Sequence, residues 1–219
     1  MTEILLIKLL HLVGFAYWLG GDLGVFLSSF AVVDDKRSTE ARLTAARILF
    51  AVDQGPRISM TMMLPLGVHL AWSLGFLPIS GTVVAGVWAL SIGWLTMVLT
   101  LHYAAASKGK TLLTGIDFYF RLLLSLSLIA VGLYSLIGPG TLVYWVAAKL
   151  AIFGGLVGCG LIIRIKLKPF TAAFGKLAAG EADDAVNQSI RKHLGGTRPI
   201  VVTIWIGLLV SAALGLHLI

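Results

Sequence analysis

Long apolar segments, separated by short stretches rich in basic residues, dominate the hydrophobic pattern of the chain. A helix that crosses a lipid bilayer needs about 20 mainly apolar residues. The segments that meet this requirement are 4–33, 58–77, 81–106, 120–137, 141–163 and 199–219. The pattern therefore predicts an all-α integral membrane bundle of six transmembrane helices, which forms a single domain over residues 1–219. The first segment is too long for a signal peptide and contains Asp22, so we expect a retained helix.

Two of the connecting stretches predict further helices with one apolar side. Ser38 or Thr39 can cap the first of them, with Glu40 in its first turn. Acidic residues at 181–184 open the second helix, and Arg191 and Lys192 close it in line with the helix dipole. The apolar positions of the two helices are Leu43, Ala46 and Phe50, and Ala182, Val186, Ile190 and Leu194. We expect both to be amphipathic cytoplasmic helices that lie on the membrane surface or on the bundle.

Composition and charge agree with a membrane protein and set its orientation. Hydrophobic residues make up 58% of the chain and charged residues only 12%, which excludes a soluble enzyme or a disordered chain. Of the 17 basic residues, all except Lys8 and Lys149 lie in or beside the connections that follow the first, third and fifth segments. Lysine and arginine in short loops stay in the cytoplasm. The pattern predicts an inner-membrane protein with basic cytoplasmic loops and both termini outside, in contact with membrane lipid and not with nucleic acid.

Ionisable side chains inside a span are candidates for function, because each is costly in hydrocarbon without a partner. The candidates are His11, Asp22, His69, His102, Lys149 and His217. At about 1.5 Å rise per residue, His11, His69 and Lys149 all lie about 10–12 Å below the outer surface. His217 lies nearer to the same surface. We therefore expect several nitrogen bases to gather in the outer leaflet.

Two imidazoles on neighbouring helices at one depth are the arrangement that ligates a b-type haem. We therefore predict haem b as the cofactor, with His11 and His69 as ligands of its iron and Lys8 placed to reach a propionate. Glycines in segments 4–33 and 141–163 offer flat surfaces for a porphyrin, although small residues at this spacing also simply let membrane helices pack closely. The alternative is that both histidines are hydrogen-bonded structural residues.

The remaining intramembrane groups suggest proton and charge transfer. Asp22 lies close to three helical turns beyond His11 on nearly the same side of the helix, an arrangement that can move a proton inward. We expect Asp22 and Lys149 to act catalytically and His217 to help bind the cofactor. Alternatively, Asp22 pairs with Arg57 or Arg121 near the inner surface.

Copper is the alternative to haem. Thioether sulfurs suit Cu(I), and Met60, Met62 and Met63 are clustered near the inner end of the second segment. His11, His69 and His217 are the same imidazoles that a copper transport or resistance permease would use. Methionine is also a common filler of gaps in apolar packing. A third possibility is a membrane anchor subunit without chemistry of its own.

A weak internal repeat relates the two ends of the chain. Leu-Gly-Val-His-Leu at residues 66–70 matches Leu-Gly-Leu-His-Leu at residues 214–218, each in a helix that returns to the outer side. A duplicated helix pair would produce this pattern, and so would coincidence.

Three short motifs resemble those of known membrane proteins. Residues 8–21, with His11, Trp18 and the glycines that follow, resemble the first helix of copper-resistance-D-like proteins and of bacterial haem-containing protoporphyrinogen oxidases. Residues 57–72 are similar to their second helix, and residues 145–150 to the Trp–Lys–Leu helix of the oxidases. The oxidases usually have four spans, and Asp22-Leu23-Gly24 replaces their arginine-containing pattern.

The resemblance implies haem b bound through His11, with Lys149 as a functional base and His69 as a further position carried over. It implies a membrane cytochrome, an oxidoreductase or its subunit. Such a protein exchanges electrons between an outer donor or porphyrin-like substrate and the quinone pool or a partner oxidoreductase.

Overall fold

The computed structural model describes residues 2–105, 107–138 and 142–218, which are almost entirely helical and contain no strand. The helices are α1 (Thr2–Val33), α2 (Thr39–Val52), α3 (Gln54–Ser73), α4 (Gly81–Tyr103), α5 (Lys108–Ile137), α6 (Tyr144–Lys166), α7 (Lys168–Ala178), α8 (Asp184–Gly195) and α9 (Arg198–Gly215). This confirms the predicted all-α class. The predicted bounds at residues 106, 141 and 219 lie outside the described residues.

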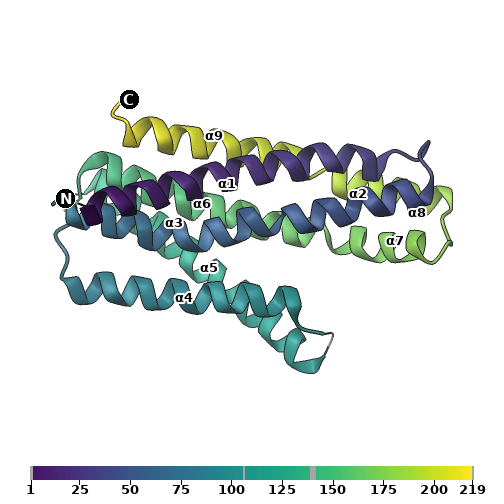
Figure 1. Ribbon diagram of the computed structural model, residues 1–219, viewed down its shortest axis with the longest axis horizontal. Helices are drawn as coiled ribbons and strands as arrows, with labels where there is room; N and C mark the ends of the chain where they lie inside the picture. The colour runs from purple at the N-terminus through teal and green to yellow at the C-terminus, as the bar shows by residue number, and fades with distance from the viewer. Residues whose placement is uncertain (1, 106, 139–141, 219) are drawn as a thin grey trace.

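The long helices run roughly alongside one another and form a bundle (Figure 1). One end of the bundle carries both chain termini and the 74–80 connection, which has no charged residue; we call it the neutral end. The opposite end carries α2, α7 and α8, and we call it the basic end. The direction of the chain alternates between the two ends, so α1, α4 and α6 all begin at the neutral end.

Five stretches of the described residues are helical, long and apolar enough to cross a membrane, which supports the predicted membrane protein. They are α1, α4, α5, α6 and the stretch 184–215 that contains α9. The predicted segment 58–77 forms α3, which is not among them because its first turns are polar. Two of its polar residues, Ser59 and Thr61, are buried among neighbouring helices and therefore need not face lipid.

Helix α5 begins at Lys108, twelve residues before the predicted start of the fourth segment at residue 120. The Ser107 hydroxyl caps this helix by accepting a hydrogen bond from the Lys110 amide at 3.1 Å. The charged residues Asp117 and Arg121 looked like the end of a loop in the sequence. Since they neutralise each other inside the bundle, they do not interrupt the helix.

A separate apolar cluster lies at the basic end, where the end of α1 meets α2, α7 and α8. Helices α2 and α8 occupy the two connecting segments that were predicted to be helical, whereas α7 was not predicted. Arg42 of α2 is buried there and donates from Nε to the Val32 carbonyl at 2.9 Å and from Nη1 to Asn187 Oδ1 at 2.8 Å. Burial lowers the pKa of Arg42, and the nearby Asp35 opposes this effect. Arg42 therefore fastens α2 and α8 to the end of α1.

Some glycines of the long helices mark places where two helices approach closely. A Cβ on Gly132 of α5 would lie 2.6 Å from the Ala147 carbonyl oxygen of α6, and a Cβ on Gly154 would lie 2.7 Å from the Ser125 carbonyl oxygen. Gly21 of α1 packs against the ring of Pro56 in the same way. Gly21 and Gly154, which lie in the two segments where the sequence left two uses open, therefore serve helix packing.

Candidate functional site

A cavity of about 650 Å³ lies between α1, α3, α6 and α9 in the described part of the chain. Its wall is mostly apolar, and the nitrogen bases that line it are Lys8, His11, Lys149 and His217. Leu5 and Leu12 also line it, although both are 60% exposed, so the cavity opens sideways along α1. Four of the predicted site residues therefore meet around one space.

His11 projects from α1 across the path of α3. Its ring fits against Gly67, where a Cβ would lie 3.2 Å from Cε1 of the imidazole. Its Nδ1 atom is buried and has no hydrogen-bond partner among the described residues. A buried imidazole nitrogen without a partner is costly unless a ligand, an ion or a water satisfies it.

Lys149 reaches the cavity from α6 and lies against Gly215 in the last turn of α9. A Cβ on Gly215 would lie 2.5 Å from the Lys149 ammonium nitrogen, so a side chain there would displace it. The ammonium also lies 5.5 Å from the ring centre of Trp145, within range of a cation–π interaction. His217 packs edge-on against the same ring at 5.4 Å, and its positive φ of 54° turns the chain after α9.

His11 and Lys149 occupy corresponding places in the two ends of the chain. Each lies on a helix that begins at the neutral end, and each packs against the glycine of a Leu-Gly-x-His-Leu motif on the returning helix, Gly67 or Gly215. A duplicated helix pair would place its bases in this way.

His69 does not line the cavity, so the structure does not bring it together with His11 there. Its Nδ1 accepts a hydrogen bond from the Trp88 indole at 3.2 Å, and its Nε2 lies 3.6 Å from Glu3 Oε1. His69 follows Gly67 by two residues, a rotation of about 200° around the helix. The similar depths of His11 and His69 suggested that they form a pair. The direction in which His69 points from the axis of α3 separates the two rings. The contacts of His69 are those of a hydrogen-bonded structural histidine, the alternative to a haem ligand.

Asp22 lies outside the cavity, and the two suggested arginine partners are wrong. Arg57 pairs with Asp53 at 2.6 Å, and Arg121 pairs with Asp117 at 3.0 Å. The Asp22 Oδ2 atom is buried and without a hydrogen bond in the described part of the chain.

Met60 and Met63 pack in one apolar cluster but have different polar surroundings. Met60 Sδ lies 4.0 Å from a nitrogen of Arg121, a cation that opposes binding of a metal cation, whereas Met63 lines the cavity beside Gly14. Within the described residues, no group of three or more His, Cys, Asp or Glu side chains is placed to hold a metal ion.

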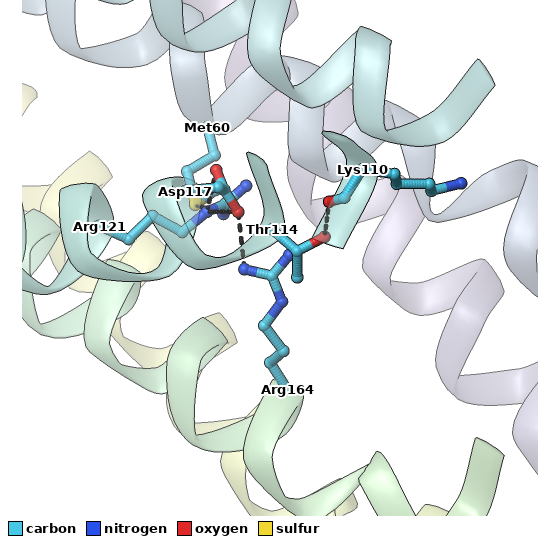
Figure 2. A network of polar contacts seen from close by, with 6 residues as sticks. All are labelled: Met60, Lys110, Thr114, Asp117, Arg121 and Arg164. Atoms are coloured by element: carbon cyan, nitrogen blue, oxygen red, sulfur yellow. Dashed lines mark hydrogen bonds and ion pairs between the residues drawn. The ribbon is translucent and has the colours of Figure 1, made fainter. Parts of the chain in front are cut away.

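A buried ionic network that the sequence did not predict joins α5 and α6 (Figure 2). Because α6 begins at the neutral end and Arg164 is two residues before its last residue, the network lies nearer the basic end. Asp117 is 0% exposed, and its two carboxylate oxygens each accept from Arg121 Nε at 3.0 Å. Arg164 of α6 donates from Nη1 to Asp117 Oδ2 at 2.7 Å. The Arg121 guanidinium also lies 5.2 Å from the ring centre of Trp94. The signal in the sequence was an Asp and an Arg four residues apart beside an apolar run, a spacing that pairs them on one side of a helix.

No family model matches the chain, and no curated protein or solved structure shows significant similarity to it. The resemblance to copper-resistance-D-like proteins and haem-containing oxidases therefore stays a prediction. Function has to be inferred from the cavity and its bases.

Proposed function

We propose that the chain is a membrane redox protein that holds haem b in the cavity between α1, α3, α6 and α9. The observation that carries the proposal is His11, which lines an apolar cavity together with two lysines and whose buried Nδ1 has no hydrogen-bond partner among the described residues. Haem b when bound supplies one-electron redox chemistry.

The residues around the cavity fit such a group. A volume of about 650 Å³ is within the range of about 300–1,000 Å³ for cavities that take small organic ligands and cofactors. His11 would hold the iron of the haem, and Lys8 and Lys149 would pair with the propionate carboxylates. His217 lines the same cavity and therefore replaces His69 as the candidate for a second ligand.

The proposed topology has six spans, with α3 as the sixth. Helices α1 and α4 both begin at the neutral end, so the chain has to return through α2 and α3 between them (Figure 1). The basic end would face the cytoplasm of an inner membrane, and the neutral end with both termini would lie outside. The cavity would then open in the outer leaflet.

The electron partners follow from the resemblance of the motifs around His11 and Lys149. An outer donor or a porphyrin-like substrate would supply electrons, and the quinone pool or a partner oxidoreductase would accept them. Asp22 would take part in proton transfer on the inner side. The copper alternative lacks support from the methionines, because Met60 faces a cation.

An absorption spectrum of the purified protein tests the proposal. We expect a Soret band that shifts on reduction with dithionite and that is lost in His11→Ala. His69→Ala is the matched control, because His69 is the same residue type at similar depth on the far side of α3; its band should persist. A colourless protein after expression with sufficient haem, or equal loss in both variants, would refute the proposal. Colourless protein that retains copper on metal analysis would favour the permease.

A further inference from the structure

The ionic network on α5 and α6 carries an unbalanced positive charge. Asp117 is the acid that its two guanidinium partners, Arg121 and Arg164, share. The other charged group that faces Arg121 is Arg57, whose charge is already balanced by Asp53 at 2.6 Å. One carboxylate against two guanidinium groups leaves a net charge of about +1 in a largely buried place, which is unfavourable without a further anion.

Arg164 is the member of the network that can reach such an anion. Its side chain is 30% exposed, whereas that of Arg121 is 10% exposed and that of Asp117 is buried. Within the described residues, Nη1 is the one nitrogen of Arg164 that makes a hydrogen bond. Figure 2 shows the side chain extending from α6 toward α5, with Asp117 at its tip. Asp117 fixes the guanidinium in place and leaves its remaining donors available.

The depth of Arg164 along α6 indicates which anions it can reach. At about 1.5 Å rise per residue, Arg164 lies about 30 Å from Tyr144 at the opposite end of α6. Asp117 lies at a similar distance from the end of α5. The hydrocarbon core of a bilayer is about 30 Å thick. If Tyr144 lies at one surface, Arg164 lies at the other, at the level of the lipid phosphates.

We propose that Arg164, held by Asp117, binds the phosphate of an anionic phospholipid at the basic end of the bundle. A guanidinium can donate two parallel hydrogen bonds to a phosphate, and basic sites between membrane helices on the cytoplasmic side bind anionic headgroups. An anionic lipid is favoured over a zwitterionic one because its net negative charge balances the network. The site is independent of any ligand in the cavity.

Native mass spectrometry of the full chain, purified from mixed micelles with equal amounts of phosphatidylglycerol and phosphatidylcholine, tests the proposal. We expect wild type to retain phosphatidylglycerol preferentially, and Arg164→Gln to lower this retention about tenfold, the effect of losing one charge-assisted contact. Lys166→Gln is the matched control, because it removes the same charge from an exposed position two residues further along α6. It should retain phosphatidylglycerol as wild type does.

Several outcomes would overturn the proposal: equal retention of the two lipids by wild type, unchanged retention in Arg164→Gln, or equal loss in Lys166→Gln. Inorganic phosphate distinguishes the source of the anion. If it stabilises wild type against thermal unfolding as strongly as phosphatidylglycerol does, the site binds free phosphate and the lipid assignment is wrong. If Arg164→Gln does not fold, Arg164→Lys can be used instead. It keeps the positive charge but lacks the planar guanidinium with its parallel donors, so it should retain phosphatidylglycerol less preferentially than wild type does.

Discussion

Replacing Asp117 by asparagine should strongly destabilise the bundle. The carboxylate is 0% exposed and accepts hydrogen bonds from both Arg121 and Arg164. The amide of the variant would be nearly the same size but neutral, and it would leave two guanidinium groups close together without a counter-charge. Breaking a buried ion pair by removing one partner costs about 3–5 kcal/mol. Because water can reach the Arg164 side chain, which is 30% exposed, we expect the lower end, about 3 kcal/mol.

The assay is reversible unfolding of the purified protein in micelles, followed by circular dichroism. Asp34→Asn is the matched control, because its pair with Arg37 at 3.1 Å is exposed, 37% for Asp34 and 55% for Arg37. Its free energy of unfolding should change by less than about 1 kcal/mol. Equal effects of the two substitutions would refute the reasoning.

A triple variant separates the unpaired charge from the loss of contacts. Asp117→Leu, Arg121→Met and Arg164→Met together remove all three charges and keep the volume nearly constant. Replacing a buried ion cluster by apolar residues is often neutral or stabilising by about 1–4 kcal/mol. The triple variant should therefore be more stable than Asp117→Asn. If it is equally unstable, the uncompensated charge is not the cause.

Three further predictions concern packing and the cavity. Gly132→Ala should lower the melting temperature, because its Cβ would lie 2.6 Å from a backbone oxygen of α6. Gly86→Ala is the control and should leave the melting temperature unchanged, because no atom lies within 4 Å of its Cβ position. Arg42→Gln should cost about 1–3 kcal/mol and make α2 more sensitive to limited proteolysis, because the buried Val32 carbonyl loses its donor; unchanged digestion would contradict this role. The proposed haem site predicts that Gly67→Val lowers the Soret absorbance of the folded protein by pushing aside the His11 ring, which is already 3.2 Å from the position of a Cβ. An unchanged spectrum would contradict a haem held by His11 in the cavity.

The membrane character of the fold could be predicted because it depends on hydropathy alone. The boundaries of the helices could not be predicted, since they depend on contacts between side chains that the sequence alone does not reveal. Helix α5 continues through Asp117 and Arg121 because the two side chains neutralise each other's charge. Each of these charged residues, taken singly, is typical of a loop. Helix α7 was missed because its apolar residues, such as Phe170 and Leu177, gain stability from α2 and α8 and not from lipid.

The candidate site was predicted in part. Depth along a helix follows from counting residues, and this placed His11 and Lys149 at one level, where both line the cavity. Which way a side chain points around the helix axis depends on how the helix is rotated against its neighbours. That rotation is set by contacts such as His11 on Gly67, and it turns His69 toward Trp88 instead.

The length of α1 links two parts of the protein that are otherwise separate. Its 32 residues extend about 48 Å, well beyond the hydrocarbon thickness, without a break. His11 is near one end of this rod, and Val32 is buried among α2 and α8 at the other. A rigid rod cannot tilt at one end without displacing the other. Any ligand that changes the angle of α1 at the cavity therefore also shifts the helices at the basic end, which couples the cavity mechanically to the opposite end of the bundle.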